Sequence, residues 1–219
     1  MAQVREIRAA VVLAALVAPL PADAGTLTAR VTAADGTPVP TAIVTAMPAG
    51  QSAIPAKAGT KAVMVQEGKQ FLPFVLPVQV GTTVEFPNRD PFRHQVYSFA
   101  PAKTFELKLY GSSVIGNVTF DKEGVVPLGC NIHDNMLAYV YVVGTPYFAA
   151  TAESGETRLD ALPAGNYAVK VWHPNQRAGQ GDAGTIQVSA TGTVNVEVKL
   201  DLKRNRTQRK PGAIDEKDY

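Results

Sequence analysis

Hydrophobic and polar residues alternate along most of the chain, which is the pattern of β-strands with one buried face. Between residues 78 and 86, Val78 and Val80 alternate with a polar neighbour, Gly81 turns the chain, and Val84 and Phe86 resume the alternation. Valine and threonine recur in such stretches, and Gly, Pro and Asp mark the turns between them. No segment keeps a helical period. The pattern therefore predicts an all-β protein made of two β-sandwiches.

The same alternation places further strands along the chain. Two are expected near the start, one before the turn at Asp35-Gly36 and one after Pro40. Others are expected within 104–110, 117–130 and 137–143. Residues 48–61, PAGQSAIPAKAGTK, are instead a low-complexity run of Ala, Pro, Gly and Lys, which predicts a connecting segment.

The first 24 residues have the pattern of a secretory signal peptide. Arg5 and Arg8 precede an apolar run over 9–20, and Ala22 and Ala24 form a small-x-small cleavage site before Gly25. A membrane anchor is the alternative, but the run is shorter than the ~20 residues of a spanning helix. We therefore expect a periplasmic protein without stable membrane insertion after cleavage of the signal.

Charge is concentrated at the end of the chain. The formal net charge is +2, and residues 203–219 contain six basic and three acidic residues. The charges of the signal segment cancel, so the body between them is close to neutral, which gives no reason to expect nucleic acid as a partner. The tail over 203–219 has almost no apolar residues and is predicted to be disordered. Contact of its basic half with an acidic partner or anionic lipid is the alternative.

Candidate chemistry gathers in two stretches. Cys130 is the only cysteine in the chain, His133 and Met136 follow it at intervals of three, and His94 lies upstream in FPNRDPFRHQVYSF. A lone cysteine cannot form an internal disulfide, so packing, a free thiol or metal ligation remain. One thiolate, two imidazoles and a distant thioether are the ligands of a blue-copper site. Zinc also accepts Cys and His, but structural zinc sites are built from Cys, His and carboxylates rather than thioethers. The sequence thus predicts one type 1 copper site.

The block 62–144 resembles the cupredoxins, the family of plastocyanin, pseudoazurin and amicyanin. Its loop Cys-x2-His-x2-Met matches the short amicyanin form, and the family segment N-x-D/E-x-x-x-H stands here as Asn88, Asp90 and His94. The resemblance implies a Greek-key β-sandwich that carries one electron through copper, with four ligands: His94, Cys130, His133 and Met136.

This block departs from the family pattern in two places. Gln95 follows the first ligand histidine where many members have Asn, and Ile132 and Asp134 flank the second where many have Pro. In related proteins the loop histidine reaches the surface within an apolar patch. Here that histidine is His133, and four residues are expected to supply the patch: Pro91, Phe92, Ile132 and Met136. Tyr97 and Phe99 are expected to pack beneath the site.

The remaining segments resemble a carboxypeptidase-regulatory-like domain, a small transthyretin-type sandwich. Its first half stands as LTARVTAADGTPVPTAIV in 27–44 and its second as ESGETRLDALPAGNYAVKVWH in 153–173. The expected organisation is therefore a discontinuous sandwich over 25–61 and 145–202 with the cupredoxin block inserted, which is tolerated at exposed loops. Two sequential domains are the alternative. The whole chain also resembles exported proteins labelled "methylamine utilization protein".

These patterns favour an exported one-electron carrier that is not an enzyme. Its redox partner is expected to be a quinoprotein dehydrogenase or a c-type cytochrome. A copper-binding or chaperone protein without redox turnover, or a structural sandwich module, are the alternatives. A binuclear copper centre needs a second cysteine, and multicopper enzymes need more than the three histidines present. The third histidine, His173, and its neighbour Trp172 are expected to be structural.

Overall fold

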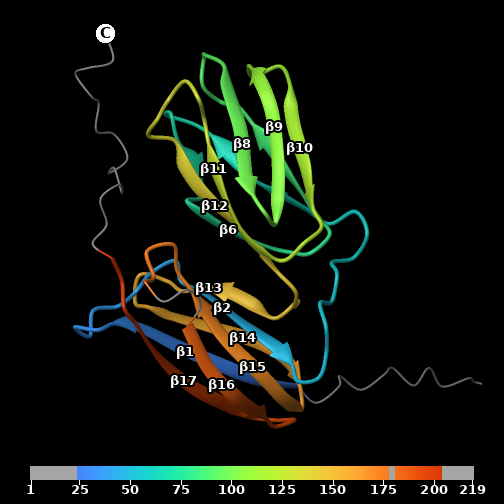
Figure 1. Ribbon diagram of the computed structural model, residues 1–219. Helices are drawn as coiled ribbons and strands as arrows, with labels where there is room; N and C mark the ends of the chain where they lie inside the picture. The colour runs from blue at the N-terminus through green and yellow to red at the C-terminus, as the bar shows by residue number, and fades with distance from the viewer. Residues whose placement is uncertain (1–23, 178–180, 204–219) are drawn as a thin grey trace, which may run out of the picture.

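The computed structural model of the protein describes residues 24–177 and 181–203, and these fold into two β-sandwiches (Figure 1). No helix is present in these two ranges. They accordingly contain no helix with the length and apolarity that crossing a membrane requires. The all-β prediction is confirmed. The predicted signal segment 1–24 and tail 203–219 lie outside the described residues, apart from Ala24 and Lys203.

One sandwich contains both ends of the described chain, and we call it the terminal sandwich. Its first sheet has β1 at the centre, antiparallel to β14 and parallel to β17. Its second sheet has the order β13-β2-β15-β16. The strands of the first sheet are β1 (Ala24–Ala33), β14 (Glu156–Pro163) and β17 (Thr193–Leu200). Those of the second are β2 (Ile43–Pro48), β13 (Phe148–Ala150), β15 (Gly165–Trp172) and β16 (Gly181–Val188).

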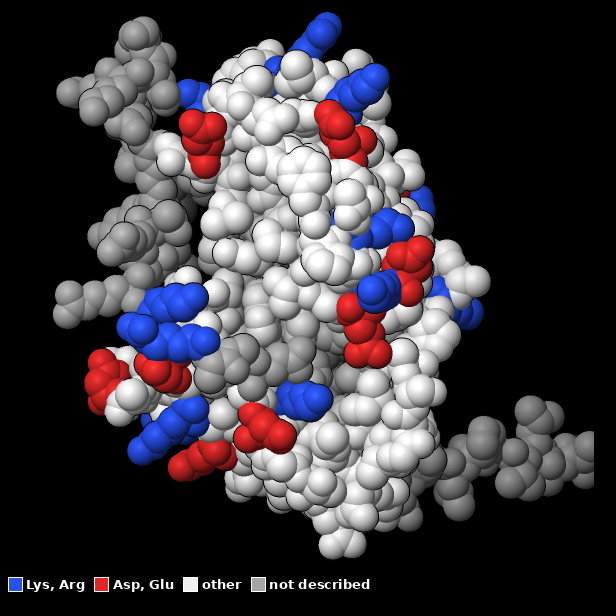
Figure 2. Space-filling view, viewed as in Figure 1, with Lys and Arg blue, Asp and Glu red and all other residues white. Residues whose placement is uncertain are grey.

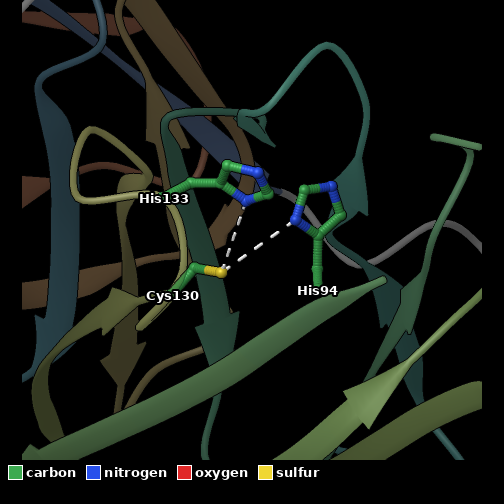
Figure 3. A group of neighbouring side chains, drawn as sticks. All are labelled: His94, Cys130 and His133. Atoms are coloured by element: carbon green, nitrogen blue, oxygen red, sulfur yellow. Dashed lines mark hydrogen bonds between the residues drawn. The ribbon is translucent and has the colours of Figure 1, made fainter. Parts of the chain in front are cut away.

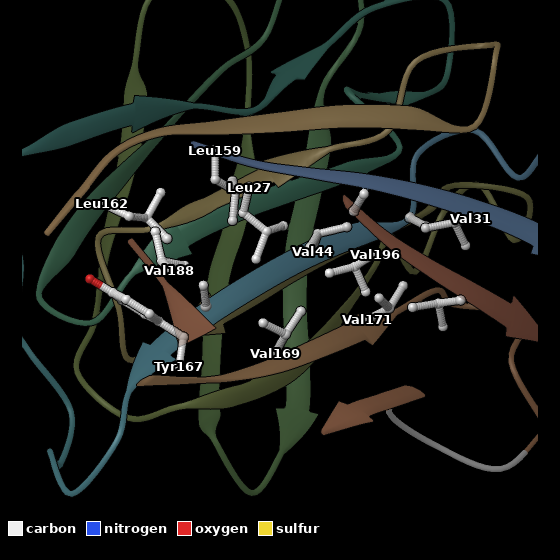
Figure 4. Packing of buried hydrophobic residues seen from close by; sticks show 14 of the residues in the cluster. Leu27, Val31, Val44, Leu159, Leu162, Tyr167, Val169, Val171, Val188 and Val196 are labelled. Carbon is white, nitrogen blue, oxygen red and sulfur yellow. The ribbon is translucent and has the colours of Figure 1, made fainter. Parts of the chain in front are cut away.

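The strands of the terminal sandwich bury one side of each alternating pattern. Leu27, Ala29 and Val31 of β1 are buried, whereas Arg30 between them is exposed. Figure 4 shows the side chains of both sheets meeting in one apolar core. Fully burying a valine or leucine side chain contributes about 1.5–3 kcal/mol. Segments more than a hundred residues apart in sequence thus share this core.

The second sandwich lies between β2 and β13 in sequence, and we call it the central sandwich. Its larger sheet has the order β6-β12-β11-β8-β9 and its smaller sheet the order β10-β7-β3. A short hairpin of β4 and β5 stands beside them. The larger sheet contains β6 (Val75–Gln79), β8 (His94–Ala100), β9 (Lys103–Tyr110), β11 (Gly124–Gly129) and β12 (Leu137–Val143). The other strands are β3 (Lys61–Val63), β4 (Val65–Gln66), β5 (Phe71–Leu72), β7 (Thr82–Pro87) and β10 (Ile115–Phe120).

An aromatic and aliphatic cluster joins the two sandwiches. Trp172 and Ile43 of the terminal sandwich pack against three residues of the central one: Val75, Tyr141 and Val143. The Trp172 and Tyr141 rings are stacked, with centroids 4.7 Å apart and planes 28° apart. The chain crosses the junction twice. A hydrogen bond joins the two connecting segments, because the Ile54 N–H donates to the Gly144 carbonyl at 2.7 Å. The insertion of one independent domain into another stays a prediction, since these contacts do not test whether either folds alone.

Charges of both signs are mixed on the face shown in Figure 2. Some oppositely charged side chains on neighbouring strands form ion pairs, such as Lys61 with Glu85 and Arg30 with Glu156. This face therefore presents no extended field of one sign, the feature that marks a nucleic-acid surface.

Candidate metal centre

Two chain segments bring the predicted ligands to one end of the central sandwich. His94 is the first residue of β8, directly after the loop 88–93 that leaves β7. Cys130 directly follows β11, and His133 and Met136 lie on the loop that leads to β12. Within that loop the Met136 N–H donates to the His133 carbonyl at 2.9 Å, which closes a tight turn. The spacing of three residues thus sets three candidate donors on one short loop.

The sulfur and two ring nitrogens converge on a single point (Figure 3). The Cys130 Sγ lies 4.0 Å from the Nδ1 of His94 and 3.9 Å from the Nδ1 of His133. The three donor atoms all lie within 4.8 Å of one another. Metal–thiolate bonds of about 2.3 Å and metal–imidazole bonds of about 2.0–2.1 Å together slightly exceed these separations. One metal ion therefore fits between the three donors.

Burial differs among the three donors. His94 is 0% exposed and Cys130 is 3% exposed, whereas His133 is partly exposed. Because water does not reach the buried imidazole and thiol, these two groups depend on other partners, and a bound metal ion would be such a partner. The arrangement thus has a dry interior side and one edge, at His133, that reaches the surface.

Asp90 holds His94 from the side away from Cys130. The Asp90 Oδ2 lies 2.7 Å from the His94 Nε2, so an Nε2–H donated to the carboxylate leaves Nδ1 to face the sulfur. The same carboxylate accepts the N–H groups of Gly68 and Lys69 at 2.7 and 3.0 Å. Burial would raise the pKa of Asp90, but the hydrogen bonds from Lys69, His94 and Gly68 outweigh it and hold the pKa below its usual value. The sequence motif Asn88-x-Asp90-x-x-x-His94 includes both residues, but the contact between them was not predicted.

Met136 is buried in the same core cluster as Cys130. The prediction that Met136 belongs to the exposed patch is therefore wrong, because its side chain packs inward beneath the loop.

An apolar rim surrounds the exposed edge. The Phe92 ring lies 5.1 Å from the His94 ring and 5.4 Å from the His133 ring, measured between centroids. Phe92 is 37% exposed and Ile132 is 51% exposed, and Pro91 is also exposed. These three residues form what we call the apolar rim.

Tyr97 and Phe99 do not pack beneath the site, which corrects the expectation from their alternation. Phe99 is 80% exposed, and the buried residues of β8 are instead its neighbours Val96 and Ser98. Residues of β8 do alternate between its two faces, but Tyr97 and Phe99 lie on the outer face. The Tyr97 ring lies over Gly129 on the neighbouring strand.

The structure also places the residues that depart from the family pattern. The Gln95 amide donates to the Glu106 carboxylate on the neighbouring strand β9 at 2.5 Å, so its side chain binds within the sheet.

His173 lies in the terminal sandwich. Its Nδ1 accepts the Asn175 N–H at 3.2 Å, and burial lowers its pKa. His173 is not part of the donor group at the other sandwich.

Several solved structures that are similar to part of this chain are copper proteins. No family model matches the chain. No curated protein matches it either. A copper-containing nitrite reductase from Thermus scotoductus SA-01 is 28% identical over 42% of this chain and 26% of its own, with a TM-score of 0.37. The chain therefore spans about a quarter of that enzyme's length.

Two smaller proteins match over nearly their whole length. A reduced amicyanin variant is 22% identical over 45% of this chain and 99% of its own, with a TM-score of 0.36. A purple cupredoxin from Nitrosopumilus maritimus is 22% identical over 38% of this chain and 99% of its own, with a TM-score of 0.33. Because these TM-scores are low, the fold class rests on the strands described above and the site on its own geometry.

Proposed function

We propose that the protein is a one-electron carrier with a single type 1 copper site in the central sandwich. The observation that carries the proposal is the convergence of the Cys130 sulfur and the two imidazole nitrogens. The proposed ligands are His94, Cys130, His133 and Met136. Bound copper supplies a couple between Cu(I) and Cu(II), which both thiolate and imidazole accept.

The protein's own residues suit this role because they hold the donors in place. Cys130 and His94 are each attached to a strand of the same five-stranded sheet, and Asp90 fixes the ring of His94. A site that stays unchanged through a redox cycle requires little rearrangement of its surroundings, since the dipoles are already oriented. His133 at the apolar rim is the proposed route for the electron to reach a partner.

The partner class follows from the rim. Transient redox encounters use small interfaces, and Pro91, Phe92 and Ile132 offer a compact apolar surface beside His133. We propose a periplasmic c-type cytochrome or quinoprotein dehydrogenase as partner, in line with the signal-like start of the chain and its resemblance to methylamine utilization proteins. We also propose that the protein itself is not an enzyme, because one cysteine and three histidines do not suffice for a multicopper centre.

The visible and electron paramagnetic resonance spectra of the copper-loaded protein test the site. One copper per chain and an intense thiolate-to-copper band are expected. Cys130→Ser removes the donor of that band, so the band should vanish, whereas His173→Gln should leave it intact. A Cys130→Ser variant with the wild-type spectrum would refute the ligand assignment.

Copper handling without redox turnover is the competing function. The complete burial of His94 favours retention of the metal, so the loaded protein should pass through many redox cycles with small reagents and keep its copper. Phe92→Asp should slow electron exchange with a cytochrome and leave the absorption spectrum unchanged. Prompt transfer of copper to an apo-acceptor upon reduction would instead establish the chaperone function.

A further inference from the structure

The junction between the two sandwiches contains a cleft of about 320 Å³. The cleft has walls from both sandwiches, since β2 and β15 form one side and β12 with the turn before β11 forms the other. Small-molecule sites commonly have volumes of about 300–1,000 Å³ and occur at such junctions. The side chains and backbone around it are Thr45, Met47, Glu123, Gly124, Tyr141, Val142, Val143, Gly144, Thr145, Ala168 and Lys170.

Three polar groups in this cleft have no partner among residues 24–177 and 181–203. Tyr141 is 4% exposed as a residue, and its hydroxyl makes no hydrogen bond there, but the hydroxyl oxygen itself reaches solvent. Glu123 and Lys170 are exposed, and neither forms an ion pair with a described residue. By contrast, the hydroxyls of Thr45 and Thr145 both donate to backbone carbonyls. The Tyr141 hydroxyl is thus accessible from the cleft and can donate a hydrogen bond to a ligand.

The positions of these groups are fixed by their neighbours. Stacking on Trp172 holds the Tyr141 ring. Burial and, to a smaller extent, the nearby Glu123 carboxylate together raise the pKa of Tyr141 to about 12, so the hydroxyl stays a donor. The Glu123 carboxylate lies against Gly144. Both residues line the cleft, so this contact places the carboxylate at its wall.

We propose that this cleft binds a small zwitterion, specifically a free α-amino acid with an apolar side chain. Glu123 and Lys170 stand on opposite walls with opposite charges, which matches an ammonium and a carboxylate on one molecule. The ligand carboxylate accepts hydrogen bonds from Lys170 and Tyr141, and its ammonium donates to Glu123. Met47, Val143 and Ala168 supply apolar contacts for the side chain. This site is separate from the metal centre and does not depend on the proposed electron transfer.

Titration of the full chain with L-leucine, followed by amide resonances, tests the site. Leucine is expected to shift the resonances of Gly144, Thr145 and Ala168 and to bind in a saturable manner. 4-Methylpentanoate, which lacks the ammonium group, and 3-methylbutylamine, which lacks the carboxylate, are each expected to bind at least about tenfold more weakly, because each loses a charge-assisted hydrogen bond. Equal binding of either half-ligand, or no shift at the junction, would overturn the proposal.

Variants separate this site from general surface charge. Glu123→Gln and Lys170→Met should each weaken leucine binding about tenfold, and Tyr141→Phe should weaken it while keeping the stacked ring. Glu197→Gln and Lys199→Met are matched controls, because they remove the same charges from another cleft on β17. A similar loss of leucine binding in the control variants would overturn the proposal, as would unchanged binding in Glu123→Gln and Lys170→Met.

Discussion

At the scale of single residues, the chemistry of the site depends on groups that do not touch the metal position. The Asp90 carboxylate binds the far nitrogen of His94 and two N–H groups of the turn between β4 and β5. Such outer contacts orient a ligand ring and tune its basicity. Asp90 thus links His94 to a turn that begins more than twenty residues earlier in the chain.

Asp90→Asn should weaken metal affinity by about ten- to a hundredfold, the usual effect of removing such a contact. It should also raise the reduction potential, because the oxidised site carries more positive charge and loses a buried negative neighbour. Metal titration and potentiometry of the loaded protein measure the two effects. Asp134→Asn is the control, since Asp134 is an exposed carboxylate beside His133 and solvent screens its charge. Equal shifts in both variants would contradict a special role for Asp90.

At the scale of elements, β8 and β11 pair at Tyr97 and Gly129, and the Tyr97 ring lies over the glycine. A Cβ on Gly129 would lie 2.7 Å from the Tyr97 Cζ and 2.8 Å from its hydroxyl oxygen. Because Cys130 follows Gly129 directly, the fit between these two strands also sets the position of the thiol. The pairing of β8 with β11 thus affects the position of the Cys130 thiol, and Gly129 is the residue that allows this pairing.

Gly129→Ala should destabilise the protein by about 1–3 kcal/mol, the usual cost of overpacking, and should alter the thiolate-to-copper band. Denaturant unfolding and the absorption spectrum measure the two effects. Removing the ring with Tyr97→Leu in the same chain should restore both. Gly111→Ala is a control, because its added Cβ meets only the Arg93 Cγ at 3.9 Å. If the double variant is no better than Gly129→Ala alone, the contact with Tyr97 is not the cause.

At the scale of the whole molecule, the two sandwiches share a packed junction as well as two chain crossings. Trp172 and Ile43 cover Tyr141, Val75 and Val143, which all belong to the central sandwich. The four donor residues nevertheless all lie within 62–144. Metal binding and the junction are therefore separable by experiment.

The block 62–144, expressed alone, should fold and bind copper, because its core cluster and its donors are its own. It should be less stable than the full chain and should self-associate, because the three junction residues become exposed. Circular dichroism, sedimentation and copper titration measure these properties. In the full chain, Trp172→Ala should cost about 3–5 kcal/mol and leave copper binding intact. An isolated block that stays unfolded with copper present would show that the sandwiches fold only together.

Features that depend on neighbours along the chain could be predicted from the sequence. Alternation within 137–143 or 27–31 is a local property, so the strands and the all-β class were predictable. The spacing of Cys130, His133 and Met136 was equally informative, because a short loop between two strands leaves its residues no freedom to separate.

Contacts between residues of different strands depend instead on tertiary packing and were not predictable. Alternation says that Tyr97 and Phe99 share one face of β8, but which face is buried depends on the sheet that covers it, and here the other face is buried. The approach of His94 to Cys130 across 36 positions and the contact of Asp90 with the turn at Gly68 likewise depend on how loops from separate strands are brought to one end. The junction at Trp172 and Tyr141 has the same origin. Long-range contacts of this kind leave no periodic trace in the sequence, because they are fixed by the packing of whole sheets and not by adjacent residues.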